Sequence, residues 1–393
     1  MKAVHFGPGN IGRGFIGLLL SQSGFEVTFV VRNERQLNML QQKKKYIVTL
    51  ANEDKDKKVV SNVSAISSQH RAEVARAIAE TDLVTTAVGL GALKHLAESI
   101  AEGIELRLRF GVRKPLHIIA CENAMDGSSQ LRSRVMKHLS PGSKALAEKY
   151  VAFPNTAVDR IVPIQDGSDS LQVTVEAYYE WVIDKSAMLE GFPEIKGVKY
   201  VDQLAPYIER KLFTVNTGHC VAAYHGYLEG YETIQEAMED EGLKRRVVSA
   251  MQETGRLLTS KYHWEKENHS TYINRMLDRF TNPLLSDDIV RVGRSPLRKL
   301  SLNDRLVRPA LQAHGLGFDI PHLTSAIAAA LLFDHKEDPE AVSLQSELKL
   351  RGVDEVITQV MGIPQKHAIH PSIVSRYHEM RRVYGASLRA SGS

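Results

Sequence analysis

Cysteine is scarce in this chain, and long apolar runs are missing. Cys121 and Cys220 are the only cysteines in 393 residues, too few and too far apart for a disulfide framework, which fits a reducing cytoplasm. The longest apolar run, Ala326 to Phe333, is far too short to cross a bilayer. Glycines near the amino terminus interrupt any signal peptide. The sequence therefore predicts a cytoplasmic protein without a membrane segment.

A large charge of one sign is also missing. The net charge of +4 over 393 residues demands neither nucleic acid nor a membrane surface as a partner. Two distant cysteines and no H-E-x-x-H motif leave no convincing metal site. We expect a small-molecule ligand, no metal, and a monomer or a small homo-oligomer.

Length and composition favour two domains, since 43% of the residues are hydrophobic and 24% are charged. Short apolar runs alternate with helical patterns in the first half, whereas long 3.6-residue patterns dominate after Val201. The predicted fold is α/β. A Rossmann-type, mostly parallel sheet domain would occupy residues 1–195, and a mainly α-helical domain would occupy residues 196–393.

The stretch from Lys2 to Asn33 predicts a strand, a glycine turn, a helix and a second strand. Gly7 would permit the tight turn, Gly9 would let the backbone approach a pyrophosphate, and Gly12 would let the helix pack close to the strand. The phosphates would meet the amides at the start of the helix. The expected dinucleotide contacts are Gly7, Gly9, Asn10, Ile11, Gly12, Arg32, Val88 and Gly89.

An acid is missing from the end of the second strand. A site for NAD usually places a carboxylate there, on the ribose hydroxyls, but this chain reads Val31-Arg32. A guanidinium at that position suits a 2′-phosphate, although an arginine in such a loop is more often only solvated. The expected cofactor is NAD, with NADP left open.

Two further strands are predicted to end beside the cofactor. The run from Leu83 to Val88 ends at Gly89, and the run from Leu116 to Cys121 ends at Glu122-Asn123. Ligands of open parallel sheets lie beyond the carboxyl ends of the strands, so Asn123 would border the site, unless it only forms a turn or caps a helix. We also expect a hairpin from Tyr46 to Val63 and edge strands between Leu171 and Ile183.

The helical half offers candidates for proton transfer. In a regular helix, Asn216 and His219 would lie about 140° and 80° around the axis from Lys211, so all three share one half of the surface. A lysine in a desolvated pocket can act as a base near neutral pH, while the amide and imidazole donate to the reacting oxygen. The alternative is an exposed lysine beside a buried amide and imidazole.

Taken together, these motifs resemble the polyol-specific long-chain dehydrogenases. The resemblance extends from end to end and is carried by His5 to Phe15, Ala120 to Ala124, Asp159 to Pro163, Lys211-x4-Asn216-x2-His219, and Arg291 to Leu300. It implies a zinc-independent, NAD-linked interconversion of mannitol 1-phosphate and fructose 6-phosphate, in a cleft between a Rossmann-type domain and a helical one. Lys211 would be the base, with Asn123, Asn216 and His219 around the carbinol oxygen. Val31 departs from the family's aspartate and leaves strict NAD preference open.

A basic cluster between Arg291 and Arg308 suggests a phosphorylated substrate. This interval contains six basic residues and one acid, Asp304. The forked guanidinium group of arginine suits a phosphate dianion. Arg294, Arg298, Lys299 and Arg305 are the expected phosphate contacts. The alternative is a solvated helix face paired with Asp287 and Asp288.

Three functions therefore remain in competition. The first is oxidation and reduction of a sugar phosphate, and the second, within the same family, is a dehydrogenase of free mannitol or a reductase of a hexuronate. The third is a nucleotide-sensing protein without turnover. Rates with phosphorylated and free substrates would distinguish them.

Overall fold

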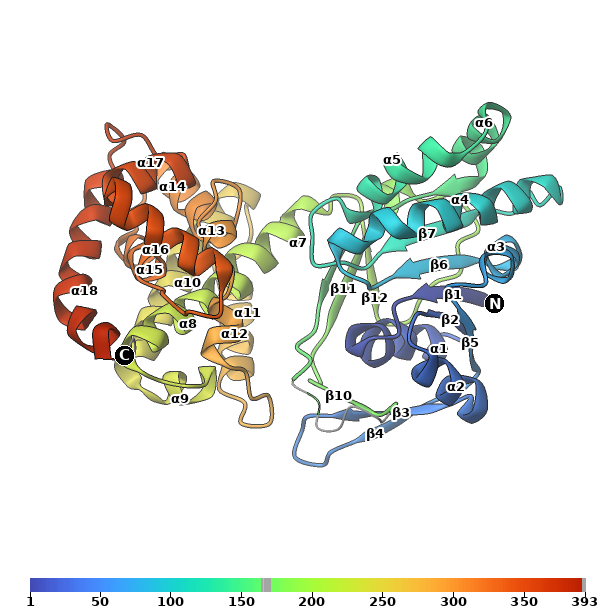
Figure 1. Ribbon diagram of the computed structural model, residues 1–393, viewed down its shortest axis with the longest axis horizontal. Coiled ribbons are helices and arrows are strands. Elements are labelled where there is room, and N and C mark those ends of the chain that lie inside the picture. The colour runs from blue at the N-terminus through green and yellow to red at the C-terminus, as the bar shows by residue number, and fades with distance from the viewer. Residues whose placement is uncertain (164, 166–170, 391–393) are drawn as a thin grey trace. The chain divides into compact units, whose positions relative to one another are not determined.

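A computed structural model describes residues 1–163, 165 and 171–390. The chain divides into two compact units, residues 1–208 and 209–393, which we call the sheet unit and the helical unit (Figure 1). No helix in the described part of the chain is long and apolar enough to span a membrane.

A six-stranded parallel sheet organises the sheet unit. Its order is β5 (Val63–Ser67), β2 (Glu26–Val31), β1 (Lys2–Phe6), β6 (Leu83–Thr86), β7 (Leu116–Ala120) and β8 (Val151–Ala152). Consecutive strands run outward from β1 in both directions, which is the strand order of a doubly wound nucleotide-binding fold. The predicted Rossmann-type parallel sheet is confirmed.

Alternating side chains divide between two cores on opposite faces of this sheet. Val4 and Phe6 of β1 join the core beneath α3 (Arg71–Glu80), α4 (Leu93–Arg109), α5 (Gly127–His138) and α6 (Pro141–Tyr150). Ala3 joins the other core, with α1 (Leu18–Gln22) and α2 (Glu34–Lys43). Figure 1 shows α4 and α5 together over one face and α1 and α2 over the other. Burial on both faces explains why the strands read as continuous apolar runs.

Two small sheets complete the unit. One has the order β10 (Val173–Val175), β3 (Tyr46–Leu50) and β4 (Lys57–Val60), and the other β12 (Val198–Val201), β11 (Glu180–Asp184) and β9 (Thr156–Asp159). β3 and β4 form an antiparallel hairpin, as the sequence predicts, but the hairpin ends at Val60, and Val63 begins β5 of the main sheet. The strands expected at the main sheet's edge between Leu171 and Ile183 belong instead to these small sheets. A short helix, η2 (Leu90–Ala92), lies between β6 and α4, and another, η3 (Lys185–Ala187), lies between β11 and β12.

The helical unit contains no strand among its described residues, which confirms the predicted helical second half. Its elements are α7 (Ala205–Arg210, which begins in the sheet unit), η4 (Lys211–Asn216), α8 (Thr217–Glu229), α9 (Ile234–Glu239), α10 (Glu241–Tyr262), α11 (Lys266–Phe280), α12 (Ile289–Gly293), α13 (Pro296–Lys299), α14 (Val307–Gly315), α15 (Pro321–Leu331), α16 (Pro339–Arg351), α17 (Val353–Met361) and α18 (His370–Ala390).

Local signals start several of these helices. Thr233 and Glu236 form a capping box at α9, and the Asp240 carboxylate accepts from the Leu243 N–H at the start of α10.

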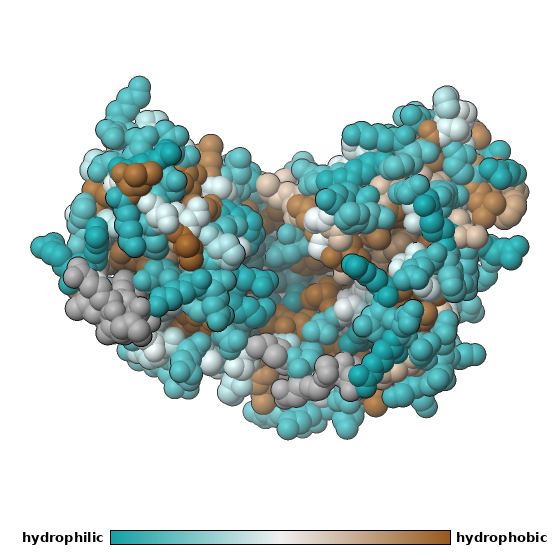
Figure 2. All heavy atoms as spheres, in the orientation of Figure 1, coloured by the Kyte–Doolittle hydropathy of each residue, from teal (hydrophilic) through white to brown (hydrophobic). Residues whose placement is uncertain are grey.

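The alanine-rich helix α15 is buried along almost its whole length. The face shown in Figure 2 is mostly hydrophilic, because amphipathic helices such as α4 direct their apolar residues inward.

Candidate active site

The glycine turn after β1, residues 7–12, is here called the nucleotide turn. Gly7 has a φ of +96°, and a Cβ there would lie 2.4 Å from the Ala87 carbonyl oxygen. A Cβ on Gly12 would lie 1.9 Å from the Gly7 carbonyl oxygen, whereas one on Gly9 would have no atom within 4 Å. The turn thus closes tightly on both sides and leaves an open backbone at Gly9, which fits a pyrophosphate.

Around this turn, Asn10 is exposed and Ile11 is partly buried against the core. The next residues, Gly12–Gly17, form a π-helical turn, η1, before α1 begins. The sequence predicts a helix here but not its wider register.

A buried histidine that we did not single out supports the nucleotide turn. His5 Nδ1 lies 2.7 Å from Thr85 Oγ1, and Nε2 lies 3.2 Å from the Gly7 carbonyl oxygen. Complete burial lowers the pKa of His5 to about 4, so the imidazole is neutral at physiological pH. A neutral ring can donate to the Gly7 carbonyl and thereby fix the turn.

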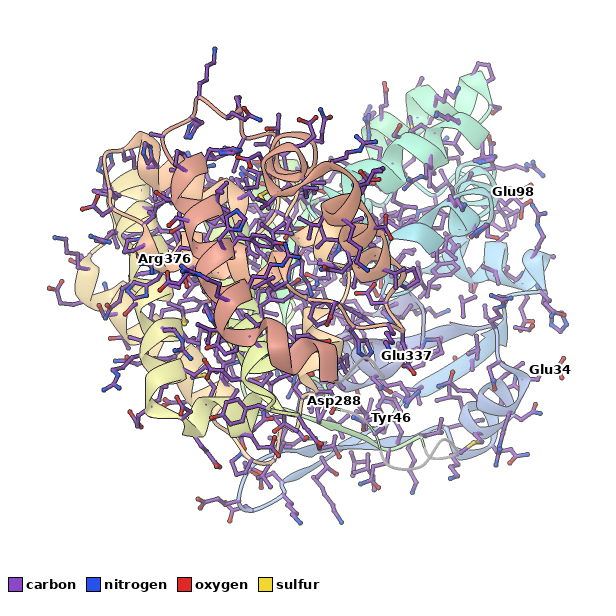
Figure 3. All side chains as sticks on the ribbon, turned by 60° about the vertical axis from the view of Figure 1, so that its left-hand side comes forward. Glu34, Tyr46, Glu98, Asp288, Glu337 and Arg376 are labelled. Atoms are coloured by element: carbon purple, nitrogen blue, oxygen red, sulfur yellow. The ribbon has the colours of Figure 1, made fainter. Side chains whose placement is uncertain are left out.

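The end of β2 has no carboxylate. Val31 is buried in the core, Arg32 is exposed, and Asn33 caps α2 by accepting from the Gln36 N–H at 2.9 Å. The next acid is Glu34, in the first turn of α2, labelled in Figure 3. The acid that is missing from the sequence at the end of β2 is therefore not replaced by a carboxylate from the next residues, and Arg32 is the exposed charged residue directly after this strand.

Glu122 organises the loop after β6, a role that the sequence analysis missed. Its buried carboxylate accepts from Thr86 Oγ1 at 2.7 Å, from the Val88 N–H at 3.0 Å and from the Gly89 N–H at 2.7 Å. Asn123, the next residue, is exposed just beyond β7. The only sequence signal was an acid directly after a buried strand. The carboxylate joins the loops at the ends of β6 and β7, where Val88, Gly89 and Asn123 are expected to act.

The elements α7, η4 and α8 form one run of helix, residues 205–229, here called the lysine helix, and most of it belongs to the helical unit. The expectation of a regular α-helix was wrong, because Lys211–Asn216 is a π-helical turn. Hydrogen bonds in such a turn join residues five apart, and Lys211 and Asn216 are five apart. The π register therefore brings the two closer to one face than the α-helical spacing would. Both side chains are partly buried.

His219 follows one turn later in a strongly basic environment. Its ring stacks on Phe280, with centroids 4.9 Å apart and planes 10° apart, and Nε2 lies 3.4 Å from Asp287 Oδ2. Burial, and then the positive charges of Arg291, Arg279, Lys299 and Arg305, lower the pKa of His219 to about 3. The neutral ring carries a single N–H, so its tautomer decides whether it donates to Asp287 or to a ligand.

The basic segment, residues 291–308, divides into exposed and buried side chains. Arg294 and Arg298 are exposed, and Arg298 lies 3.8 Å from Asp304. Arg305 Nε donates to Asp304 at 2.7 Å. Lys299 is buried and donates to the Val292 carbonyl, and burial lowers its pKa to about 8. The four predicted phosphate contacts therefore differ in how readily a ligand could reach them.

Arg291 pairs with Asp287 at 2.5 Å. The alternative expectation, a helix face paired with Asp287 and Asp288, is therefore confirmed for this residue. Arg294 is exposed, and its positive charge acts on the Asp287 carboxyl, where it partly opposes the rise in pKa that burial causes. An exposed guanidinium of this kind is accessible to a phosphate dianion.

Glu209 anchors the lysine helix two residues before Lys211, and it was also missed. Its buried carboxylate accepts from Lys261 at 2.7 Å, Tyr262 at 2.7 Å and Arg308 at 2.8 Å. These partners lie 52 to 99 residues away in the sequence, so no local pattern could reveal them.

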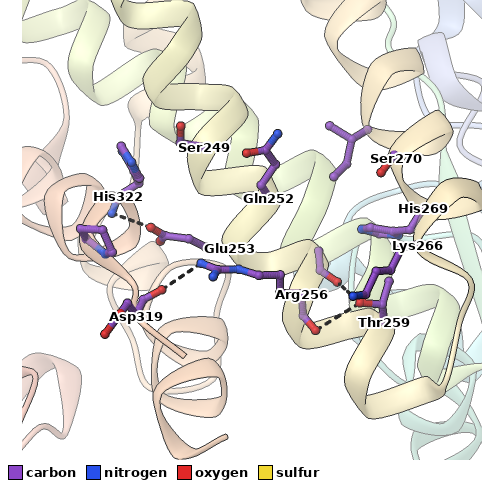
Figure 4. Close-up of a pocket in the computed structure, with 13 residues that line it drawn as sticks. Ser249, Gln252, Glu253, Arg256, Thr259, Lys266, His269, Ser270, Asp319 and His322 are labelled. Atoms are coloured by element: carbon purple, nitrogen blue, oxygen red, sulfur yellow. Dashed lines mark hydrogen bonds between the residues drawn. The ribbon is translucent and has the colours of Figure 1, made fainter. Parts of the chain in front are cut away.

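A cavity of about 650 Å³ lies between α10, α11 and the start of α15. In Figure 4 the Glu253 carboxylate accepts from the backbone of His322, while Lys266 and His269 line the other side. No residue expected to act in catalysis lines this cavity. Acids, bases and hydroxyls are mixed in its wall, so the lining does not indicate one class of ligand.

Metal ligands are not gathered anywhere in the described residues: no group of three or more His, Cys, Asp or Glu side chains is placed to hold an ion. Cys121 and Cys220 are both buried and free.

Comparison with protein families gives two matches that together span nearly the whole chain. Residues 1–197 match the mannitol dehydrogenase Rossmann domain, and residues 203–381 match the mannitol dehydrogenase C-terminal domain. The division follows the change from strands to helices described above.

Curated relatives are similar along their full length. A mannitol-1-phosphate 5-dehydrogenase of Brevibacillus brevis is 50% identical over 98% of this chain and 100% of its own. Proteins of the same name from Geobacillus stearothermophilus and Bacillus subtilis are 47% and 46% identical, over 97% and 96% of this chain and 100% of their own.

Solved structures share the fold at low sequence identity. A substrate-free D-sorbitol dehydrogenase is 17% identical with a TM-score of 0.81, covering 96% of this chain and 93% of its own. Mannitol 2-dehydrogenase of Pseudomonas fluorescens, in a ternary complex with NAD and D-mannitol, is 18% identical with a TM-score of 0.74, covering 100% and 92%.

Proposed function

The chain belongs to the mannitol dehydrogenase family, and from that premise we propose that it interconverts D-mannitol 1-phosphate and D-fructose 6-phosphate. The observation that carries this proposal is the identity of 44–50%, over 94–98% of the chain, with relatives named mannitol-1-phosphate 5-dehydrogenase. The site residues and the identity of the cofactor are further parts of the same proposal.

We propose NAD as the cofactor, at the nucleotide turn. The open backbone at Gly9, between the close contacts at Gly7 and Gly12, supports a bound pyrophosphate. A bound nicotinamide supplies the hydride acceptor. Arg32 replaces the usual acid, so the preference for NAD over NADP is the part of this proposal with the least support from neighbouring residues.

The helical unit contributes the proton acceptor. As the hydride leaves C5 of mannitol 1-phosphate, the neutral amine of Lys211 takes the hydroxyl proton, and the C5–O bond becomes the ketone of fructose 6-phosphate. Asn216 and Asn123 donate hydrogen bonds to the oxygen while it carries negative charge. His219 donates a hydrogen bond to the same oxygen through its Nδ1–H, in the tautomer that leaves Nε2 unprotonated. No metal is needed for these steps.

The basic segment supplies a reason for a phosphorylated substrate. Burial, and then the positive charges of Arg279 and of three side chains of this segment, lower the pKa of His219, so the surroundings favour an anion. The three are Arg291, Lys299 and Arg305. Arg294 and Arg298, which are exposed, are proposed to contact the phosphate dianion. The positive charges of Lys299 and Arg305 are proposed to strengthen the electrostatic attraction of that anion.

The decisive measurement is the initial rate of reduction of fructose 6-phosphate with NADH and with NADPH. We expect turnover with NADH and a much lower kcat/KM with NADPH. Oxidation of mannitol 1-phosphate should proceed far faster than oxidation of free mannitol, also in the presence of a chelator. A preference for free mannitol or a hexuronate would overturn the phosphate assignment, and nucleotide binding without any turnover would favour a sensing protein.

A further inference from the structure

The π-helical turn of the lysine helix depends on contacts outside its own backbone. In this turn the Thr217 N–H bonds to the Leu212 carbonyl, five residues earlier, where an α-helix would use the residue four earlier. A π turn is rare and is frequently found at functional sites. The lysine helix returns to the α-helical register immediately afterwards, in α8.

The side chain of Thr217 is placed to hold this register. The residue is fully buried, and its Oγ1 lies 3.1 Å from the Leu212 carbonyl oxygen and 2.5 Å from the Arg305 carbonyl oxygen. One hydroxyl proton is shared between these two acceptors, and the shorter contact favours Arg305. The same side chain therefore joins the π turn to the basic segment, 88 residues further along the chain.

A second threonine, Thr214, lies within the π turn in an unfavourable environment. Thr214 is buried, and its hydroxyl has no hydrogen-bond partner in the described part of the chain. A buried hydroxyl without a partner is unfavourable, so contacts elsewhere must stabilise the turn. Thr217 supplies such contacts on its carboxyl side, and the ion pairs of Glu209 supply them on its amino side.

We propose that Thr217 is a positioning residue: its hydroxyl fixes the π turn, so that Lys211 and Asn216 project together, and ties that turn to the backbone of Arg305. This inference rests on the proposed function for its catalytic meaning. The placement of the proton acceptor is then coupled to the placement of the segment proposed to hold the substrate phosphate.

The test replaces Thr217 with valine, which keeps the shape and removes the hydroxyl. We expect kcat for mannitol 1-phosphate to fall roughly 10- to 100-fold, since small misplacements of a reacting group cost that much. The KM for NAD should stay unchanged, and the apparent pKa of the rise of kcat with pH should shift. Thr217→Ser, which keeps the hydroxyl, should restore both kcat and the pH profile.

Thr254→Val is the matched control. Thr254 is also a fully buried threonine, and its Oγ1 lies 3.0 Å from the Met251 carbonyl oxygen within α10. The chemical change is the same, but no π turn is involved, so any loss of stability should come without a change in the pH profile. If Thr217→Val does not fold, Thr217→Ala takes its place in the same comparison.

Amide hydrogen exchange separates this inference from the proposed function. If the wild-type protein turned over neither substrate, the proposed function would fail, but faster exchange at residues 211–217 in Thr217→Val than in Thr254→Val would still support the holding role. The inference is overturned if Thr217→Val keeps the wild-type kcat, pH profile and exchange rates, or if Thr217→Ser fails to restore them.

Discussion

The nucleotide turn of the sheet unit leads into a π-helical turn and the lysine helix contains one, but the two regions depend on different kinds of contact. The nucleotide turn requires glycines, because a Cβ at Gly7 or Gly12 would collide with backbone, and the His5 ring adds one hydrogen-bonding contact to the Gly7 carbonyl. The lysine helix is held by side chains, through the Thr217 hydroxyl and the Glu209 carboxylate. Steric exclusion tolerates no larger residue, whereas a hydrogen-bonded support can be weakened one bond at a time.

The largest effect should follow from removing the proposed base. Lys211→Ala should lower kcat by roughly 10²- to 10⁴-fold, the range for general acid–base groups, with little change in nucleotide affinity, since the nucleotide turn does not use this side chain. Steady-state rates and nucleotide titrations measure the two quantities. Lys244→Ala changes a partly exposed lysine on α10 that pairs with Glu241; it is the control and should retain wild-type rates. Wild-type kcat in Lys211→Ala would remove the lysine from the mechanism.

Gly12→Ala and Gly9→Ala test the steric account of the nucleotide turn. The added methyl of Gly12→Ala would meet backbone at 1.9 Å, so the free energy of unfolding should fall by about 3 kcal/mol. Gly9→Ala has open space around its Cβ and should keep its stability while binding the dinucleotide less tightly. Urea unfolding and nucleotide titration of both variants give the comparison. Equal stability losses would show that packing does not distinguish the two glycines.

Glu122→Gln asks whether the sheet unit also depends on a hydrogen-bonded support. An amide cannot accept from Thr86, Val88 and Gly89 as a carboxylate does, so we expect a loss of about 1–3 kcal/mol in unfolding free energy and a roughly tenfold loss of nucleotide affinity. Glu105→Gln is the control, because Glu105 accepts from the Ser140 N–H at 2.7 Å in the same unit, away from the nucleotide turn. If both variants lost the same affinity, the effect would be one of general stability.

The smallest expected effect is a difference in how ligand affinity depends on pH, between fructose 6-phosphate at the helical unit and the nucleotide at the sheet unit. Burial lowers the pKa of Lys299 to about 8, so its positive charge is present at pH 7 and is lost as the pH rises through 8. Binding of fructose 6-phosphate should therefore weaken roughly threefold between pH 7 and 9.5, and this change should vanish in Lys299→Met. Nucleotide affinity should stay flat, because His5, with its pKa near 4, is neutral throughout. Calorimetric titrations across this range test both statements.

The sequence predicts what depends on local pattern. A mostly parallel sheet follows from alternating strands and helices, and the tight turn at Gly7 and Gly12 follows from the glycine spacing. The supports of the site depend on partners that are distant in sequence: Glu122 and Thr86 are 36 residues apart, His5 and Thr85 are 80 apart, and Thr217 and Arg305 are 88 apart. The π register was missed for the same reason, because it depends on tertiary contacts and not on helix periodicity.

The shared carboxylate of Glu122 has a practical consequence for redesign. Because one side chain holds the backbone after β6 and immediately precedes Asn123 after β7, these two loops cannot be exchanged independently. A graft that imports the segment around Gly89 from another dehydrogenase would also need a carboxylate at the head of the following loop. Engineers who wish to exchange either loop should therefore transplant both segments together.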